Sequence, residues 1–134
     1  MIETGNVAHI GIAVKCVERS LPFYIEILNL TLEKVEIVQS QSVKVAFLKK
    51  GLLKIELLEP INKSSKLTQF LKERGEGLHH IALEVNSMEK EMDTLQRLKI
   101  PILYDTPEKG ANGARINFIH PKATSGVLFE LYES

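Results

Sequence analysis

Two stretches of the chain carry the same pair of residue types, in the same order and at nearly the same spacing. His9 stands in an apolar run near the start and is followed by Glu56; His80 stands in a similar run and is followed by Glu130. If two similar halves pack about a pseudo-two-fold axis, equivalent residues meet at one point, so such a repeat constrains the fold more than a single motif does. Two His and two Glu at one point are typical of a divalent metal site.

Length and composition indicate one domain with a small-molecule partner. A chain of 134 residues with 44% hydrophobic residues can fill one core, whereas two separate halves would be marginal. We expect a single domain over 1–134, with a first module at about 6–60, a connector helix at about 61–76 and a second module at about 77–134. Seventeen basic and seventeen acidic residues cancel, so nucleic acid and anionic membranes are not expected partners.

The chain shows no sign of export. Its one cysteine, Cys16, cannot form an internal disulfide, and the first residues lack the basic end and apolar run of a signal peptide. No apolar run is long enough for a membrane span. We therefore expect a cytoplasmic protein.

The predicted elements follow the same order in both halves. The first half is expected to form a strand at 7–14, a helix at 17–29 with Pro22 near its first turn, and strands at 33–39, 43–49 and 52–59. The second is expected to form a strand at 78–85, a helix whose start is marked by Asn86 and Glu89, and strands near 101–104, 114–119 and 126–132. A short helix ending at Gly75 joins them. The predicted class is α+β, with two tandem βαβββ modules.

Other titratable residues are interpreted as structural. A lone strand histidine is usually structural, so the metal hypothesis depends on the symmetric quartet, whose ligands suit Zn, Co, Mn, Ni or Fe(II). Strand alternation points His79 away from His80, where we expect a structural hydrogen bond. His120, at a predicted strand end, either has a role in the loop or in support of the site's ligands, or contacts the substrate. Glu59 and Glu133 each lie three residues beyond a ligand candidate, on the opposite face, and are expected to face solvent.

Several segments carry a resemblance to a known family: 9–14, 22–24, 55–60, 77–82, 118–122 and 126–131. They resemble the vicinal oxygen chelate, or glyoxalase-type, superfamily and, within it, the methylmalonyl-CoA epimerase family, over nearly the whole chain. The double histidine at 79–80 and the segment His120-Pro121-Lys122 are the more specific parts. The resemblance implies a glyoxalase-like half-open barrel and a homodimer.

The resemblance also implies an activity. It is that of an isomerase that interconverts (2R)- and (2S)-methylmalonyl-CoA, an acyl-CoA substrate, by proton abstraction and return at C2 through a metal-stabilised enolate. One divalent ion (Co, Zn, Mn or Ni) is implied, held by His9, His80 and Glu130 with Glu56 as a fourth ligand. Glu130 and Glu56 are the catalytic candidates. In some epimerases Glu56 is replaced by glutamine and a base stands where this chain has Val45, so Glu56 is the opposite base, a ligand, or both.

Three alternatives share the fold. Glyoxalase I (lactoylglutathione lyase) moves a proton between adjacent carbons with the same metal geometry, and the quartet alone does not separate the two enzymes. A non-catalytic drug-binding protein of the bleomycin-resistance type needs the cavity without a complete quartet. A dioxygenase uses Fe(II) with two His and one carboxylate, which leaves the fourth ligand unexplained. Lys109, Arg115 and Lys122 are available for coenzyme A phosphates, although surface lysines and arginines are usually only solvated.

Overall fold

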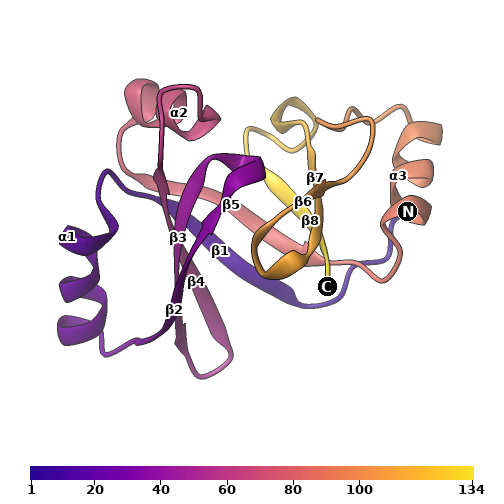
Figure 1. Ribbon diagram of the computed structural model, residues 1–134. Coiled ribbons are helices and arrows are strands. Elements are labelled where there is room, and N and C mark those ends of the chain that lie inside the picture. Colours follow the sequence, from indigo (N-terminus) through magenta and orange to yellow (C-terminus); the bar gives the residue numbers. More distant parts are fainter. The chain divides into compact units, whose positions relative to one another are not determined.

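The computed structural model describes residues 1–134, and each half of the chain forms β-α-β-β-β in its order (Figure 1). The strands are β1 Val7–Ala13, β2 Thr31–Val38, β3 Val43–Lys50, β4 Leu53–Pro60, β5 Gly77–Glu84, β6 Glu108–Lys109, β7 Arg115–Ile119 and β8 Phe129–Glu133. The α-helices are α1 Val17–Pro22, α2 Lys66–Arg74 and α3 Met88–Arg97. None of the helices has both the length and the apolar character that a bilayer crossing needs.

The chain divides into two compact units: residues 9–79, here the first unit, and residues 1–8 with 80–134, the second unit. The strand order is β2-β3-β4-β1 in the first unit and β5-β8-β7-β6 in the second. In each unit the strand that carries the predicted histidine is parallel to the strand that carries the predicted glutamate, and the other neighbours are antiparallel. Both units therefore pair their strands in the same way.

Helix α1 of the first unit packs on one face of that unit's sheet (Figure 1). Val17, Leu21 and Tyr24 recur at helical spacing and contact a buried cluster that includes Leu48 and Leu57. The predicted helix over 17–29 is two helices, because Pro22 lies at the end of α1 and not in its first turn. The chain continues as a π-helix, Phe23–Ile27, in which Leu28 N–H donates to the carbonyl of Phe23.

The second unit buries the apolar face of α3 against its own sheet. Met88, Met92 and Leu95 pack with Ile119 and Leu131. The helix begins one residue later than predicted, because the cap is the Oγ of Ser87, which accepts from the backbone N–H of Lys90 at 3.3 Å. The connector helix α2 ends at Gly75, as predicted, with φ 77°.

Two predicted strands of the second unit are wrong in position. The segment 101–104 makes a single bridge, Ile102 to Ile119, and the short strand β6 comes later. The last strand begins at Phe129 instead of 126, because a 3-10 turn, Pro121–Ala123, is followed by the positive φ angles of Ser125 and Gly126.

Candidate active site

The first unit brings His9 and Glu56 together. Strands β1 and β4 are parallel and place Gly11 beside Glu56. His9 lies two residues before Gly11 and so projects from the same face of the sheet, where Gly11 leaves room beside the imidazole. The Nδ1 of His9 is 3.1 Å from the Oε2 of Glu56. Both residues are buried, with 4% and 6% of their surface exposed.

The second unit repeats this arrangement with His80 and Glu130. Strands β5 and β8 are parallel and place Ala82 beside Glu130, and His80 lies two residues before Ala82. The Nε2 of His80 is 3.6 Å from the Oε1 of Glu130, and both residues are buried. The repeat read in the sequence is therefore also a repeat of geometry, one His–Glu pair in each unit.

A phenylalanine stands beside the carboxylate of each pair. Phe47 on β3 is the register partner of Glu56, and Phe118 on β7 is that of Glu130. Sequence reasoning missed both, although each lies in the strand that precedes a glutamate strand, which is the signal that identifies them. The ammonium of Lys34 is 5.1 Å from the ring centre of Phe47. The apolar rings lower the local polarity around each carboxylate.

Each pair has donor atoms that suit a divalent metal ion. A charged carboxylate is expensive to bury unless a cation or a set of hydrogen bonds compensates it. An imidazole nitrogen and a carboxylate oxygen that face each other are the donor types that Zn, Co, Mn and Ni share. The residues present therefore fit such an ion.

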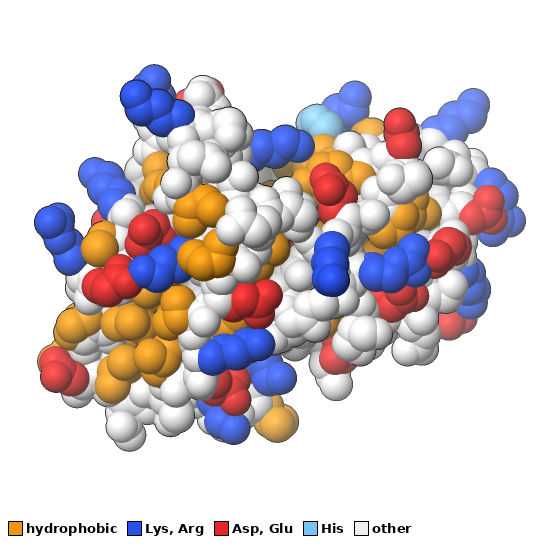
Figure 2. Space-filling view, viewed as in Figure 1, with side chains coloured by type: hydrophobic (Ala, Val, Ile, Leu, Met, Phe, Trp, Pro, Cys, Tyr) orange, Lys and Arg blue, Asp and Glu red, His pale blue; other side chains and the backbone are white.

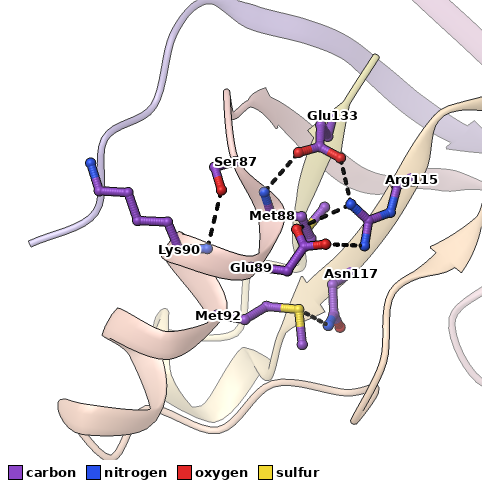
Figure 3. A network of polar contacts seen from close by, with 8 residues as sticks. All are labelled: Ser87, Met88, Glu89, Lys90, Met92, Arg115, Asn117 and Glu133. Carbon is purple, nitrogen blue, oxygen red and sulfur yellow. Dashed lines mark hydrogen bonds and ion pairs between the residues drawn. The ribbon is translucent and has the colours of Figure 1, made fainter.

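Glu59 and Glu133 do not simply face solvent, which corrects the sequence interpretation. Glu59 accepts a hydrogen bond from the backbone N–H of Val17 at 2.7 Å, and Glu133 accepts one from that of Met88 at 2.9 Å (Figure 3). Each carboxylate thus holds the first turn of its unit's α-helix. These donors have no partner within a helix, so the contacts are structural.

A basic residue pairs with a first-turn glutamate in each unit. Arg115 binds Glu89 at 2.6 Å and Glu133 at 2.9 Å (Figure 3), and Lys44 pairs with Glu18. The pKa of Glu89 is lowered by its hydrogen bond from Arg115, and that of Glu18 by its bond from Lys44. Arg115 therefore belongs to a network of ion pairs at the start of α3.

The two other histidines have local contacts. His79 packs edge-on against Phe70 of α2, with ring centres 4.8 Å apart, and burial with the nearby Arg74 charge lowers its pKa from 6.5 to about 4. Its imidazole is therefore neutral at neutral pH. The Nδ1 of His120 accepts from the backbone N–H of Lys122 at 3.1 Å, a local contact within the loop.

Comparison with known proteins places the chain in a family. The family model described as the glyoxalase/bleomycin resistance protein/dioxygenase superfamily matches residues 8–118. An uncharacterized protein of Bacillus subtilis, YqjC, is 41% identical over 93% of this chain and 89% of its own length. The mitochondrial methylmalonyl-CoA epimerase of mouse is 34% identical over 97% and 74%. The ethylmalonyl-CoA/methylmalonyl-CoA epimerase of Cereibacter sphaeroides is 33% identical over 95% and 96%.

Solved structures support the same family. The methylmalonyl-CoA epimerase of Mycobacterium tuberculosis has a TM-score of 0.93 and 32% identity, covering 98% of this chain and 89% of its own. The Streptomyces coelicolor methylmalonyl-CoA epimerase in complex with 2-nitronate-propionyl-CoA has a TM-score of 0.93 and 33% identity, covering 98% and 96%. The chain belongs to the glyoxalase/bleomycin resistance protein/dioxygenase superfamily. The family model and the solved structures confirm the predicted α+β glyoxalase-like class. The relatives that are named as epimerases confirm the predicted isomerase.

Proposed function

We propose that this protein is a metal-dependent epimerase that interconverts (2R)- and (2S)-methylmalonyl-CoA. The observation that carries the proposal is the pair of equivalent His–Glu arrangements, because inversion at one carbon requires a group to remove a proton on one side and another to return one on the other. The named epimerases of mouse and Cereibacter sphaeroides, similar over nearly the whole chain, support the choice of substrate. A solved methylmalonyl-CoA epimerase in complex with methylmalonyl-CoA supports an acyl-CoA ligand.

We propose that the two units act as one domain and together hold one divalent ion, which is Co, Zn, Mn or Ni. The ligands would be His9, His80 and Glu130, with Glu56 as the fourth. Such an ion supplies Lewis acidity, which stabilises the negative charge that develops on the thioester oxygen when the C2 proton leaves. The burial of all four side chains supports this set, because electrostatic interactions are stronger where water is excluded.

The protein's own acid–base groups are Glu56 and Glu130. One carboxylate takes the C2 proton, and the other returns a proton on the opposite face. The place of a further base in some epimerases is occupied here by Val45, a buried residue whose register partner on β4 is Leu58. Neither Val45 nor Leu58 can transfer a proton. Glu56 is therefore the base that we propose for the first unit.

We also infer a homodimer. Six exposed apolar residues of the first unit, here the apolar patch, lie on the π-helix, on the residue after it and on the outermost strand β2; the patch consists of Phe23, Ile27, Leu28, Leu32, Val35 and Ile37. Figure 2 shows apolar side chains gathered over this part of the molecule. Exposed apolar clusters of this kind are common where proteins associate.

The experiment that tests the activity follows deuterium uptake at C2. Metal-reconstituted protein is incubated with methylmalonyl-CoA in deuterated water, and the product mass is measured. We expect uptake that is lost after chelation of the metal and in His80→Ala, and that is kept in the control Glu26→Ala, at an exposed position outside the site. No uptake with Co, Zn, Mn or Ni would overturn the proposal; turnover of methylglyoxal with glutathione would then indicate glyoxalase I, and absence of metal affinity a drug-binding protein.

A further inference from the structure

Asn117 is a fully buried polar residue that fixes the position of Tyr104. Its Oδ1 accepts from the backbone N–H of Tyr104 at 3.1 Å, and its Nδ2 donates to the carbonyl of Tyr104 at 3.0 Å. The Nδ2 also lies 3.4 Å from the Sδ of Met92 on α3 (Figure 3). A buried amide with these bonds holds both backbone polar groups of one residue, so the segment that carries Tyr104 is fixed against β7.

The ring of Tyr104 is thereby held against the candidate site of the second unit. It meets the ring of Phe118 edge-on, with ring centres 5.9 Å apart, and Phe118 meets the ring of His80 with centres 6.0 Å apart. Phe118 is also the register partner of Glu130. Phe118 is buried and Tyr104 is half-buried, so the row of rings leads outward from the His80–Glu130 pair.

An apolar wall beside the pair suits one part of the proposed substrate, and this inference rests on the proposed function. C2 of a malonyl-type acyl-CoA carries a carboxylate, a thioester and a short alkyl group. The first two carry oxygen atoms that suit the divalent ion of the proposed function, whereas burial of the alkyl group against aromatic faces is favourable. The relative from Cereibacter sphaeroides is named for both ethylmalonyl-CoA and methylmalonyl-CoA, substrates that differ in this group.

We propose that Tyr104 and Phe118 form the wall that receives the C2 alkyl group, and that the ring of Tyr104 limits the size of that group. Tyr104 is then a specificity-determining residue, and Asn117 is a positioning residue that acts through it. Tyr104 is half-buried at the outer end of the row of rings, so a longer alkyl group that extends outward along this row would meet its ring. A smaller side chain at 104 would leave room for one more methylene.

The test compares kcat/KM for ethylmalonyl-CoA and methylmalonyl-CoA, both followed by deuterium uptake at C2. In Tyr104→Ala the ratio of the two values should rise about tenfold, because one methylene in an apolar pocket changes kcat/KM by about 10-fold to 200-fold. Tyr104→Phe keeps the ring and should keep the wild-type ratio. Leu103→Ala is the matched control: its backbone N–H bonds the carbonyl of Phe118, its side chain is exposed, and its ratio should not change.

Asn117 is tested by the same ratio, which a general loss of stability does not move. Asn117→Asp keeps the size and the acceptor but loses the donor to Tyr104, so the ratio should rise in the direction of Tyr104→Ala. The double variant should show no further rise. A thermal melt of each variant establishes that it is folded.

The outcomes separate the inference from the proposed function. Absence of uptake by the wild-type protein with both substrates would overturn the proposed function and this inference with it. Uptake by the wild type with an unchanged ratio in folded Tyr104→Ala, or an equal loss with both substrates, would overturn the size limit alone. A ratio that changes in Tyr104→Phe would also overturn it, because the hydroxyl would then be responsible.

Discussion

Glu59 and Glu133 hold equivalent places in the two units, and each binds the start of a helix. The carboxylate of Glu59 accepts a hydrogen bond from the first backbone N–H of α1 at 2.7 Å, and that of Glu133 accepts one from the first backbone N–H of α3 at 2.9 Å. Each lies three residues after a proposed ligand on the same strand, Glu56 or Glu130, and so projects to the opposite face of the sheet. A negative charge at a helix N-terminus is favourable. One strand end in each unit therefore connects the candidate site on one face to the helix on the other.

Removal of this contact should lower stability without removing the site. We expect Glu133→Ala to reduce the free energy of unfolding by about 1 to 2 kcal/mol, because it leaves the Met88 N–H without its acceptor and takes one partner from Arg115. Urea titration measures the change. Glu26→Ala, at an exposed position, should shift it by less than about 0.5 kcal/mol. Equal values for both variants would contradict the capping role.

Gly110 is required by close packing against β7. A Cβ at this position would lie 2.9 Å from Cγ2 and 3.1 Å from Cδ1 of Ile116, whose branched side chain cannot move away easily. Gly110→Ala should therefore destabilise the fold by about 1 to 3 kcal/mol. In a double-mutant cycle with Ile116→Ala the two costs should not add, since the clash is gone. Full additivity would refute this explanation.

The two proposed bases should be separable by isotope exchange. In Glu56→Gln, one base remains, so one epimer should still exchange its C2 proton for deuterium while epimerisation falls by at least about a hundredfold. In Glu130→Gln the other epimer should exchange. Mass spectrometry and a stereospecific assay on each pure epimer measure the two events. Epimerisation by Glu56→Gln at the wild-type rate would show that Glu56 is not a base.

His79 should make stability depend on pH in the metal-free protein. Its folded-state pKa of about 4 lies below the unfolded value of 6.5, so the unfolded chain binds more protons between these values and stability falls as pH decreases from 6.5 to 4. The contribution is on the order of 3 kcal/mol. His79→Phe keeps an aromatic ring against Phe70 and should remove this dependence. If the free energy of unfolding changed by the same amount between pH 7 and pH 5 in the wild type and in His79→Phe, the prediction would be contradicted.

The apolar patch should carry the association of two copies. We expect Ile37→Lys to turn a dimeric protein into a monomer, because a charge in an apolar interface loses its hydration. Sedimentation velocity measures the mass. Leu52→Lys is the control, since Leu52 is 99% exposed at the tip between β3 and β4 and lies outside the patch. A monomeric wild type, or dimers of both variants, would refute the role of the patch.

Local pattern was enough to find the two His–Glu pairs. Side chains alternate along a strand, so His9 shares a face with Gly11, and a parallel neighbour then places Glu56 beside Gly11. The same rule holds for His80 and Glu130. Local pattern could not predict the role of Asn117. The hydrogen bonds of Asn117 to the backbone of Tyr104 replace the strand pairing that the apolar segment 101–104 suggested. A single side chain that competes for backbone groups leaves no period in the sequence.

Local sequence alone predicts the β-α-β-β-β order, the repeat and the residue types of the candidate site, because each segment carries its own hydrophobic period and donor chemistry. The surroundings of these residues are visible only in the folded chain. Phe47 and Phe118 lie beside the carboxylates through cross-strand register, and Glu59 and Glu133 meet the helices through backbone N–H groups more than forty residues away in the chain. Such contacts depend on how strands pair and how helices pack on them. A local sequence pattern does not predict contacts between residues so far apart in the chain.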